Sequence, residues 1–252
     1  MKEADWDRYV EAYHDGHPGI TEEALQHARH PVHGSAYEWL ADALPDPAGD
    51  VVDLACGSCP MQSHIAYSSY LGIDRNEAEL TAARSAGRGP VALGDVTDLD
   101  LPDDSADTIV MSMALMLVPL AETLSQVARV LRPGGTFAAM VPATGPISIQ
   151  DVPALLALTA ALRGPGSMPR QLSRRSLERH LVNAGLAQVR VARQRFPFPL
   201  TCDTDARLAV TSLYTPGRTP GQLQRAERWL TAVPGAAQLP VPLLRVTARL
   251  PR

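Results

Sequence analysis

Lysine, cysteine and aromatic side chains are all scarce in this sequence. Among its 252 residues Lys2 is the only lysine, three residues are cysteines and 5% are aromatic. This composition excludes a disulfide-dense small protein. No stretch provides the ~20 apolar residues of a membrane-spanning helix, because Pro142, Gly145 and Pro146 interrupt the longest uncharged run, residues 133–150. The acidic, polar beginning of the chain differs from a signal peptide, so we expect a cytoplasmic protein without a membrane partner.

The residues that are present describe an ordinary globular protein with unevenly distributed charge. Apolar residues make up 45% and charged residues 20% of the chain, and this length suffices to bury a large core. Residues 1–150 hold 8 basic and 22 acidic residues, a net charge of −14, whereas residues 151–252 hold 15 and 5, a net charge of +10. The asymmetry predicts either two modules or one fold whose two ends face different ligands.

Short apolar runs alternate with helical periodicity from residue 50 onward. Runs typical of strands cover residues 51–56, 70–74, 90–95, 107–115 and 136–142. An amphipathic helix is expected over residues 119–131, ended by the Pro-Gly-Gly of residues 133–135. This alternation predicts a parallel sheet with crossover helices. Further helices are expected at residues 6–13, 37–44, 152–162, 173–184, 205–214 and 222–232, and further strands at 187–196 and 241–250.

Three carboxylates follow strands in the first half of the chain. Asp53 begins DLACGSCP, a turn of small residues that lets the backbone approach a ligand at the carboxyl end of a strand. Asp74 ends the strand LGID, a position from which a carboxylate accepts hydrogen bonds from both ribose hydroxyls. Asp95 ends the next strand and could receive the exocyclic amine of an adenine. Together they predict a nucleotide-like cofactor, although an acid at a strand end also commonly caps a helix.

Four ordered segments make the sequence similar to a known family. They are VVDLACG, LGID, ALGDVTDLDLPDDSADTIV and LSQVARVLRPGGTFAAMVP, within residues 50–142. Their order and spacing resemble the class I S-adenosylmethionine-dependent methyltransferases, in particular the small-molecule, type 11-like group. The resemblance implies an α/β, Rossmann-like fold with a seven-stranded, mostly parallel sheet, helices on both faces and a helical cap. It also implies S-adenosyl-L-methionine as the cofactor.

The resemblance also implies which residues contact the cofactor. Residues 53, 55 and 57 would hold its methionine end, residue 74 its ribose, residues 75, 95 and 96 its adenine, and residues 111 and 112 its sulfonium. On the first helix, residue 13 would either cover the cofactor or belong to the core. The expected cofactor-binding residues are therefore Tyr13, Asp53, Ala55, Gly57, Asp74, Arg75, Asp95, Val96, Met111 and Ser112.

The chain departs from the family pattern at four positions. Ala55 and Cys59 stand where the family turn usually carries glycine, and Ala106 replaces an aromatic residue before Asp107. Leu117 stands where many relatives carry a histidine after the fourth strand. Because no cofactor carboxylate is lost, cofactor binding is still expected. A methyltransferase fold repurposed as a cyclase or a non-catalytic binding protein remains the main alternative.

Two further residue patterns suggest other chemistry. Cys56 and Cys59 form a CxxC before Pro60, as in thioredoxin-like redox proteins, but that hypothesis leaves the LGID and RPGG segments unexplained. No second CxxC supplies the remaining ligands of a zinc site, so we expect no metal. Five of seven histidines precede residue 34, and His14 is the candidate general base among them.

Eight arginines gather between Arg163 and Arg195, with Glu178 as the only acidic residue. They either attract an anion or form a solvated helix face and strand edge. Nucleic acid is not an expected partner, because aromatic residues for base stacking are not interleaved with them.

We therefore predict one methyltransferase domain over residues 1–252. It comprises an N-terminal helical cap (1–45), a cofactor-binding core (46–142), and substrate-cap insertions with the last strands (143–252). The expected reaction is methyl transfer to a small molecule, with a neutral or anionic acceptor favoured by the basic second half. The arginine-rich, lysine-poor composition suggests bacterial specialised, natural-product metabolism. The sequence leaves open whether the protein is a monomer or a homodimer.

Overall fold

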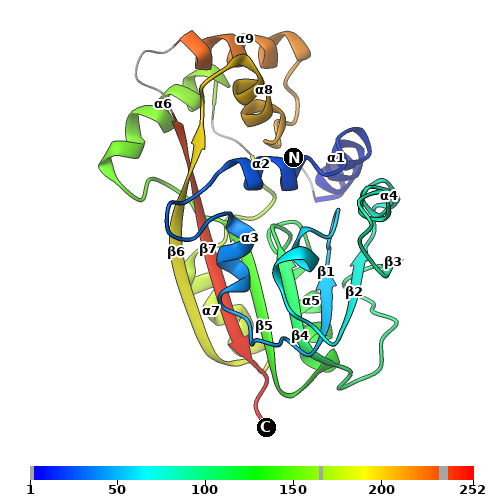
Figure 1. Ribbon diagram of the computed structural model, residues 1–252. Helices are drawn as coiled ribbons and strands as arrows, with labels where there is room; N and C mark the ends of the chain where they lie inside the picture. The colour runs from blue at the N-terminus through cyan, green and yellow to red at the C-terminus, as the bar shows by residue number, and fades with distance from the viewer. Residues whose placement is uncertain (1–2, 165–166, 233–237) are drawn as a thin grey trace.

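The computed structural model describes residues 3–164, 167–232 and 238–252, which include a seven-stranded sheet (Figure 1). Its order is β3-β2-β1-β4-β5-β7-β6, and only β7 runs antiparallel to its neighbours β5 and β6. The predicted fold class is therefore confirmed. The strands are β1 (Asp50–Leu54), β2 (Ser69–Asp74), β3 (Val91–Leu93), β4 (Ala106–Ser112), β5 (Leu131–Pro142), β6 (Ala187–Pro199) and β7 (Gln238–Arg249).

Helices cover both faces of the sheet because neighbouring residues of its central strands point to opposite sides. On β1, Val51 packs into a core shared with α3 (Ala36–Ala41), η1 (Pro60–His64) and α4 (Glu77–Ser85). The next residue, Val52, packs into a second core with α5 (Leu120–Val130) and α7 (Arg174–Asn183). Burial on both sides explains why these strands are short continuous apolar runs.

The remaining helices form a cap above the carboxyl ends of the parallel strands (Figure 1). They come from the N-terminal region and from residues 149–161 and 203–232. None of the described helices combines the length and the apolar character needed to cross a bilayer. The cap helices are α1 (Glu3–Gly16), α2 (Ile20–His27), η2 (Ile149–Asp151), α6 (Val152–Ala161), α8 (Asp203–Thr211) and α9 (Pro220–Ala232).

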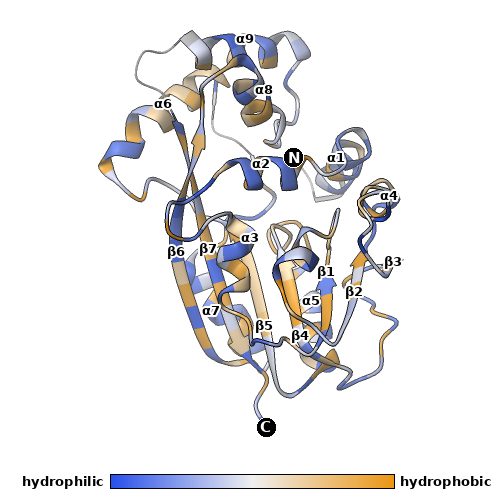
Figure 2. Ribbon diagram, viewed as in Figure 1, coloured by the Kyte–Doolittle hydropathy of each residue, from blue (hydrophilic) through white to orange (hydrophobic). Residues whose placement is uncertain are grey.

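Several elements differ from the sequence-based predictions, among them α2 and α4, which were not expected, the start of β5 and the turn after β1. Strand β5 begins at Leu131, directly after α5, because Leu131 already pairs with Ala106 before the register shifts. The predicted start at residue 136 is therefore five residues late. The turn after β1 leads only into the five-residue 3-10 helix η1, with Pro60 in its first turn. Strand β6 lies at the edge of the sheet opposite to β3, and its sequence alternates between polar and apolar residues, as is typical of an edge strand (Figure 2).

Candidate cofactor-binding site

A cavity of about 310 Å³ opens at the carboxyl ends of the parallel strands, with α1 on its other side. This is the edge at which open α/β sheets bind nucleotide-like ligands. The structure brings most of the predicted site residues together there, although they come from five separate parts of the chain. The predicted residues that line the cavity are His14, Ala55, Gly57, Asp74, Arg75, Asp95, Val96 and Ser112.

The loop after β1 has an unusual backbone conformation. Ala55, Gly57 and Cys59 have φ values of 50°, 53° and 55°, the left-handed region that favours glycine. Two of these are the positions where the family usually carries glycine. Ala55 and Cys59 adopt the left-handed conformation although they carry side chains. Between them, the Gly57 N–H donates a hydrogen bond to Asp74 Oδ2 at 2.8 Å.

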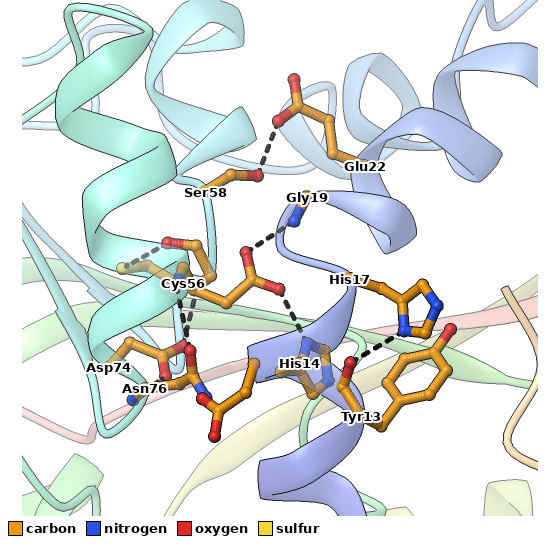
Figure 3. Close-up of polar contacts among 12 residues, drawn as sticks. Tyr13, His14, His17, Gly19, Glu22, Cys56, Ser58, Asp74 and Asn76 are labelled. Carbon is orange, nitrogen blue, oxygen red and sulfur yellow. Dashed lines mark hydrogen bonds and ion pairs between the residues drawn. The ribbon is translucent and has the colours of Figure 1, made fainter.

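Asp74 is held in a fixed orientation at the end of β2 (Figure 3). Its Oδ1 accepts the Asn76 N–H at 2.8 Å, while Oδ2 accepts that of Gly57. Burial raises the pKa of Asp74, and the two backbone hydrogen bonds act in the opposite direction. Because each carboxylate oxygen has a second lone pair, the group retains capacity for two further donors. Ribose hydroxyls would fit this pattern.

Asp95 and Ser112 add two polar groups farther along the cavity. Asp95 Oδ1 accepts hydrogen bonds from the Thr97 N–H and hydroxyl at 2.8 and 2.7 Å, which lowers the pKa of Asp95 despite partial desolvation. The Ser112 hydroxyl oxygen is buried and has no partner among the described protein atoms. A buried polar group without a partner is unfavourable unless a ligand or water satisfies it. The residues present therefore fit a polar cofactor.

Three of the predicted cofactor-binding residues lie outside the cavity lining. Tyr13 is buried, and its hydroxyl donates to the Thr211 carbonyl at 2.7 Å. Asp53 is buried in β1, where it accepts a 2.7 Å hydrogen bond from the Tyr70 hydroxyl. Met111 is fully buried in the core beside α5. Their predicted contacts with the cofactor stay predictions.

Asp53 is expected to make stability depend on pH. Burial raises its pKa to about 7, against about 4 for an aspartate in an unfolded chain. The folded state therefore binds more protons between these values, so the free energy of unfolding should fall as pH rises from about 4 to about 7. Asp53→Asn removes this titration. It should therefore reduce the fall in the free energy of unfolding between pH 4 and 7 by at most on the order of 4 kcal/mol.

Urea unfolding at pH 4, 5.5 and 7 measures this effect. Asp100→Asn, a change at an exposed aspartate, is the matched control and should keep the wild-type profile. Parallel profiles for Asp53→Asn and the wild type would show that Asp53 does not titrate in this range.

Several lining residues were not anticipated from the sequence. Glu79 on α4 and Tyr214 between α8 and α9 both face the cavity and contact His14. Met113, just beyond β4, lines the cavity with a φ of 59°. A glutamate inside an amphipathic helix and a tyrosine in a loop carry no local signal of a site. Only the packing of distant segments brings them here.

The two cysteines of the CxxC lie inside the protein, and Cys56 also lines the cavity. Cys56 and Cys59 are buried, unbridged, and packed over Gly72 of β2. A hydrogen bond with Cys59 and burial raise the pKa of the Cys56 thiol, the opposite of what a redox nucleophile needs. The arrangement therefore offers no support for the dithiol hypothesis. Among the described residues, no three His, Cys, Asp or Glu side chains are grouped as a metal site requires.

Comparison with known proteins agrees with the predicted fold. Residues 52–139 match the family described as "Methyltransferase domain". A Mycolicibacterium smegmatis protein named "Probable S-adenosylmethionine-dependent methyltransferase" is 34% identical over 130 residues, covering 50% of this chain and 48% of that protein. The chain thus spans about half the length of the curated relatives it matches.

Solved structures share the fold at low sequence identity. The YcgJ protein of Bacillus subtilis superposes with a TM-score of 0.60 and 17% identity, covering 86% of this chain and 98% of that one. Phosphoethanolamine N-methyltransferase 2 of Haemonchus contortus, solved with S-adenosyl-L-methionine, gives 0.61 and 12%, covering 98% and 60%. Residues 52–139 thus match a methyltransferase domain family, and the fold is that of the similar solved structures, one of which holds S-adenosyl-L-methionine, the predicted cofactor.

Proposed function

We propose that this protein transfers a methyl group from S-adenosyl-L-methionine to a neutral small molecule, in bacterial specialised metabolism. The observation that carries the proposal is the convergence, in one cavity, of the oriented Asp74 carboxylate, the Asp95 carboxylate and the unpartnered Ser112 hydroxyl. The arginine-rich, lysine-poor composition supports the metabolic setting.

The charge of the cavity supports this cofactor. Its lining includes one arginine, Arg75, and several carboxylates. This excess of negative charge complements the ammonium and sulfonium groups of S-adenosyl-L-methionine. When bound, the cofactor supplies a methyl group that is already electrophilic, so the protein has mainly to orient the acceptor and exclude water. The lining carboxylates are those of Asp7, Glu11, Glu22, Asp74, Glu79 and Asp95.

The same lining favours a neutral acceptor over an anionic one. Among the described residues of the basic second half, Tyr214 lines the cavity but no arginine does. The charge of +10 therefore lies outside the cavity, and it gives an anionic acceptor no direct partner. The walls near the end of β4 are instead apolar, formed by Met113, Leu117 and Val118. Of the two expected acceptor classes, the neutral one therefore fits this lining.

Matched phenols test the reaction and the charge preference together. The same phenol group occurs with a neutral, a negative and a positive substituent in 4-hydroxybenzyl alcohol, 4-hydroxybenzoate and tyramine. These three compounds are tested together with other aromatic alcohols, amines and thiols. Transfer of radiolabelled methyl should be faster, in kcat/KM, to 4-hydroxybenzyl alcohol than to 4-hydroxybenzoate. Equal or faster transfer to 4-hydroxybenzoate would contradict the charge argument. Cofactor binding without transfer to any acceptor would favour a repurposed scaffold.

A further inference from the structure

Glu79, His14 and Tyr214 come from three segments that are distant in the sequence, yet two hydrogen bonds join them. His14 Nδ1 lies 2.7 Å from Glu79 Oε1, and His14 Nε2 lies 2.9 Å from the Tyr214 hydroxyl. All three residues line the cofactor cavity. Figure 3 shows His14 on its helix, facing the side of the cavity that carries Asp74 and Asn76. These two hydrogen bonds therefore link α4 of the core to two parts of the cap, namely α1 and the segment between α8 and α9.

Glu79 is the anchor on the core side. It is 3% exposed on α4, and its backbone N–H donates to the Asn76 side chain that caps this helix. Its second oxygen, Oε2, accepts the Gly19 N–H at 2.9 Å. Both carboxylate oxygens thus bind the N-terminal region, one through α1 and one through the turn before α2. A carboxylate this deeply buried needs such donors, so their loss would be costly.

On the cap side, α1 is joined to the segment after α8 by more than His14. The Tyr13 hydroxyl donates to the Thr211 carbonyl at 2.7 Å, and the Thr215 N–H donates to the Tyr9 hydroxyl at 2.8 Å. The rings of Tyr13 and Tyr214 also pack edge to face, with centroids 4.8 Å apart. Helix α1 and residues 211–215 therefore form one unit, and Glu79 fastens that unit to the core.

We propose that Glu79, His14 and Tyr214 form a clasp that closes the N-terminal helix and the cap segment over the bound cofactor and slows its release. This inference rests on the proposed function, because the ligand beneath the clasp is S-adenosyl-L-methionine or its product, S-adenosylhomocysteine. Closure of this kind keeps water away from the reacting groups, and product release through it commonly limits turnover.

The clasp gives His14 a role different from general base. Both of its ring nitrogens have partners, Glu79 on one side and Tyr214 on the other, so neither is free to accept a proton from an acceptor while the clasp is closed. His14 is thus a positioning residue in this proposal. It acts on the reaction through the placement of α1.

The dissociation rate of S-adenosylhomocysteine tests the clasp without any acceptor. Surface plasmon resonance on the immobilised full-length chain gives association and dissociation rates separately. Tyr214→Phe removes one hydrogen bond and should speed dissociation about 3- to 10-fold. Glu79→Gln weakens two bonds to a charged group and should speed it about 10- to 100-fold. Association should change less than about twofold, because the open state is the one that binds.

Tyr67→Phe is the matched control, since Tyr67 is 40% exposed, accepts one hydrogen bond from Gln62 and lies outside the cavity lining. It should leave both rates unchanged. If Glu79→Gln does not fold, Tyr214→Phe alone tests the clasp, and a thermal melt checks that this variant is folded. Dissociation at the wild-type rate in Tyr214→Phe, or equal acceleration in Tyr67→Phe, would overturn the clasp alone. Failure of the wild-type chain to bind S-adenosylhomocysteine would overturn the proposed function with it.

Discussion

Asp74→Ala should weaken the binding of S-adenosylhomocysteine at least about 100-fold, because hydrogen bonds from two ribose hydroxyls to a carboxylate are lost together. The structure prepares this carboxylate in advance. Two backbone N–H groups, those of Gly57 and Asn76, fix its plane, and the second lone pair of each oxygen is left for the ligand. Isothermal titration calorimetry measures the loss directly as a change in Kd.

Two further variants separate loss of ligand contacts from disturbance of the loop. Asp74→Asn keeps the side-chain shape and one acceptor oxygen, so its Kd should fall between those of Asp74→Ala and the wild type. Asp100→Ala removes an exposed carboxylate in the loop after Asp95 and should bind normally. If Asp74→Ala binds within about threefold of the wild type, the ribose assignment is wrong.

Gly72→Ala should destabilise the fold by about 2–3 kcal/mol, because the added methyl group overpacks a closed interior. A Cβ atom at this position would lie 2.6 Å from Cys59 Sγ and 2.9 Å from Cys56 Sγ. Cys59 is 0% exposed, and its left-handed backbone restricts how far the loop can shift. Urea unfolding measures the change in free energy.

A second substitution, Cys59→Gly, tests whether the Cys59 side chain causes the loss of stability in Gly72→Ala. Glycine removes the nearer sulfur and suits the φ of 55° at this position. In the Cys59→Gly background, the cost of Gly72→Ala should drop by about 1–2 kcal/mol, a coupling typical of residues in contact. Equal costs in both backgrounds would show that Cys59 does not set the space above Gly72. The result bears on function, since the same loop places Gly57 against Asp74.

The sheet could be predicted from sequence because its strands carry local signals. Each parallel strand is a short apolar run next to a helical period, and the acids at residues 74 and 95 follow such runs. The start of β5 could not be predicted, because the pairing of Leu131 with Ala106 is a tertiary contact across a proline and two glycines. The local sequence pattern instead predicts the end of a helix at residue 131 and a turn at residues 133–135.

The candidate site shows the same division. Asp74 is the last residue of β2 and Asp95 follows β3, and both line the cavity, whereas Asp53 and Met111 lie within strands and are buried. Strand β4 ends at Ser112, and the next residue, Met113, has a left-handed backbone and lines the cavity. Contacts formed by distant segments, such as Glu79 with His14, are invisible to any local pattern.

The uneven charge of the sequence acquires a spatial meaning. The acidic first half supplies nearly all of the cavity, including its carboxylates. Described arginines of the second half are occupied elsewhere, for example Arg195 with Asp151, Arg174 with Glu178, and Arg245 over the Trp39 ring. The asymmetry therefore belongs to one fold, in which the acidic part faces the cofactor.

A crystal structure of the full chain with S-adenosylhomocysteine tests the central claim most directly. The account predicts the ligand in the cavity at the carboxyl ends of β1, β2 and β4. Its ribose hydroxyls should lie within hydrogen-bond distance of the Asp74 carboxylate, with its adenine beside Asp95 and Val96. A ligand bound elsewhere, or a ribose without contact to Asp74, would contradict it.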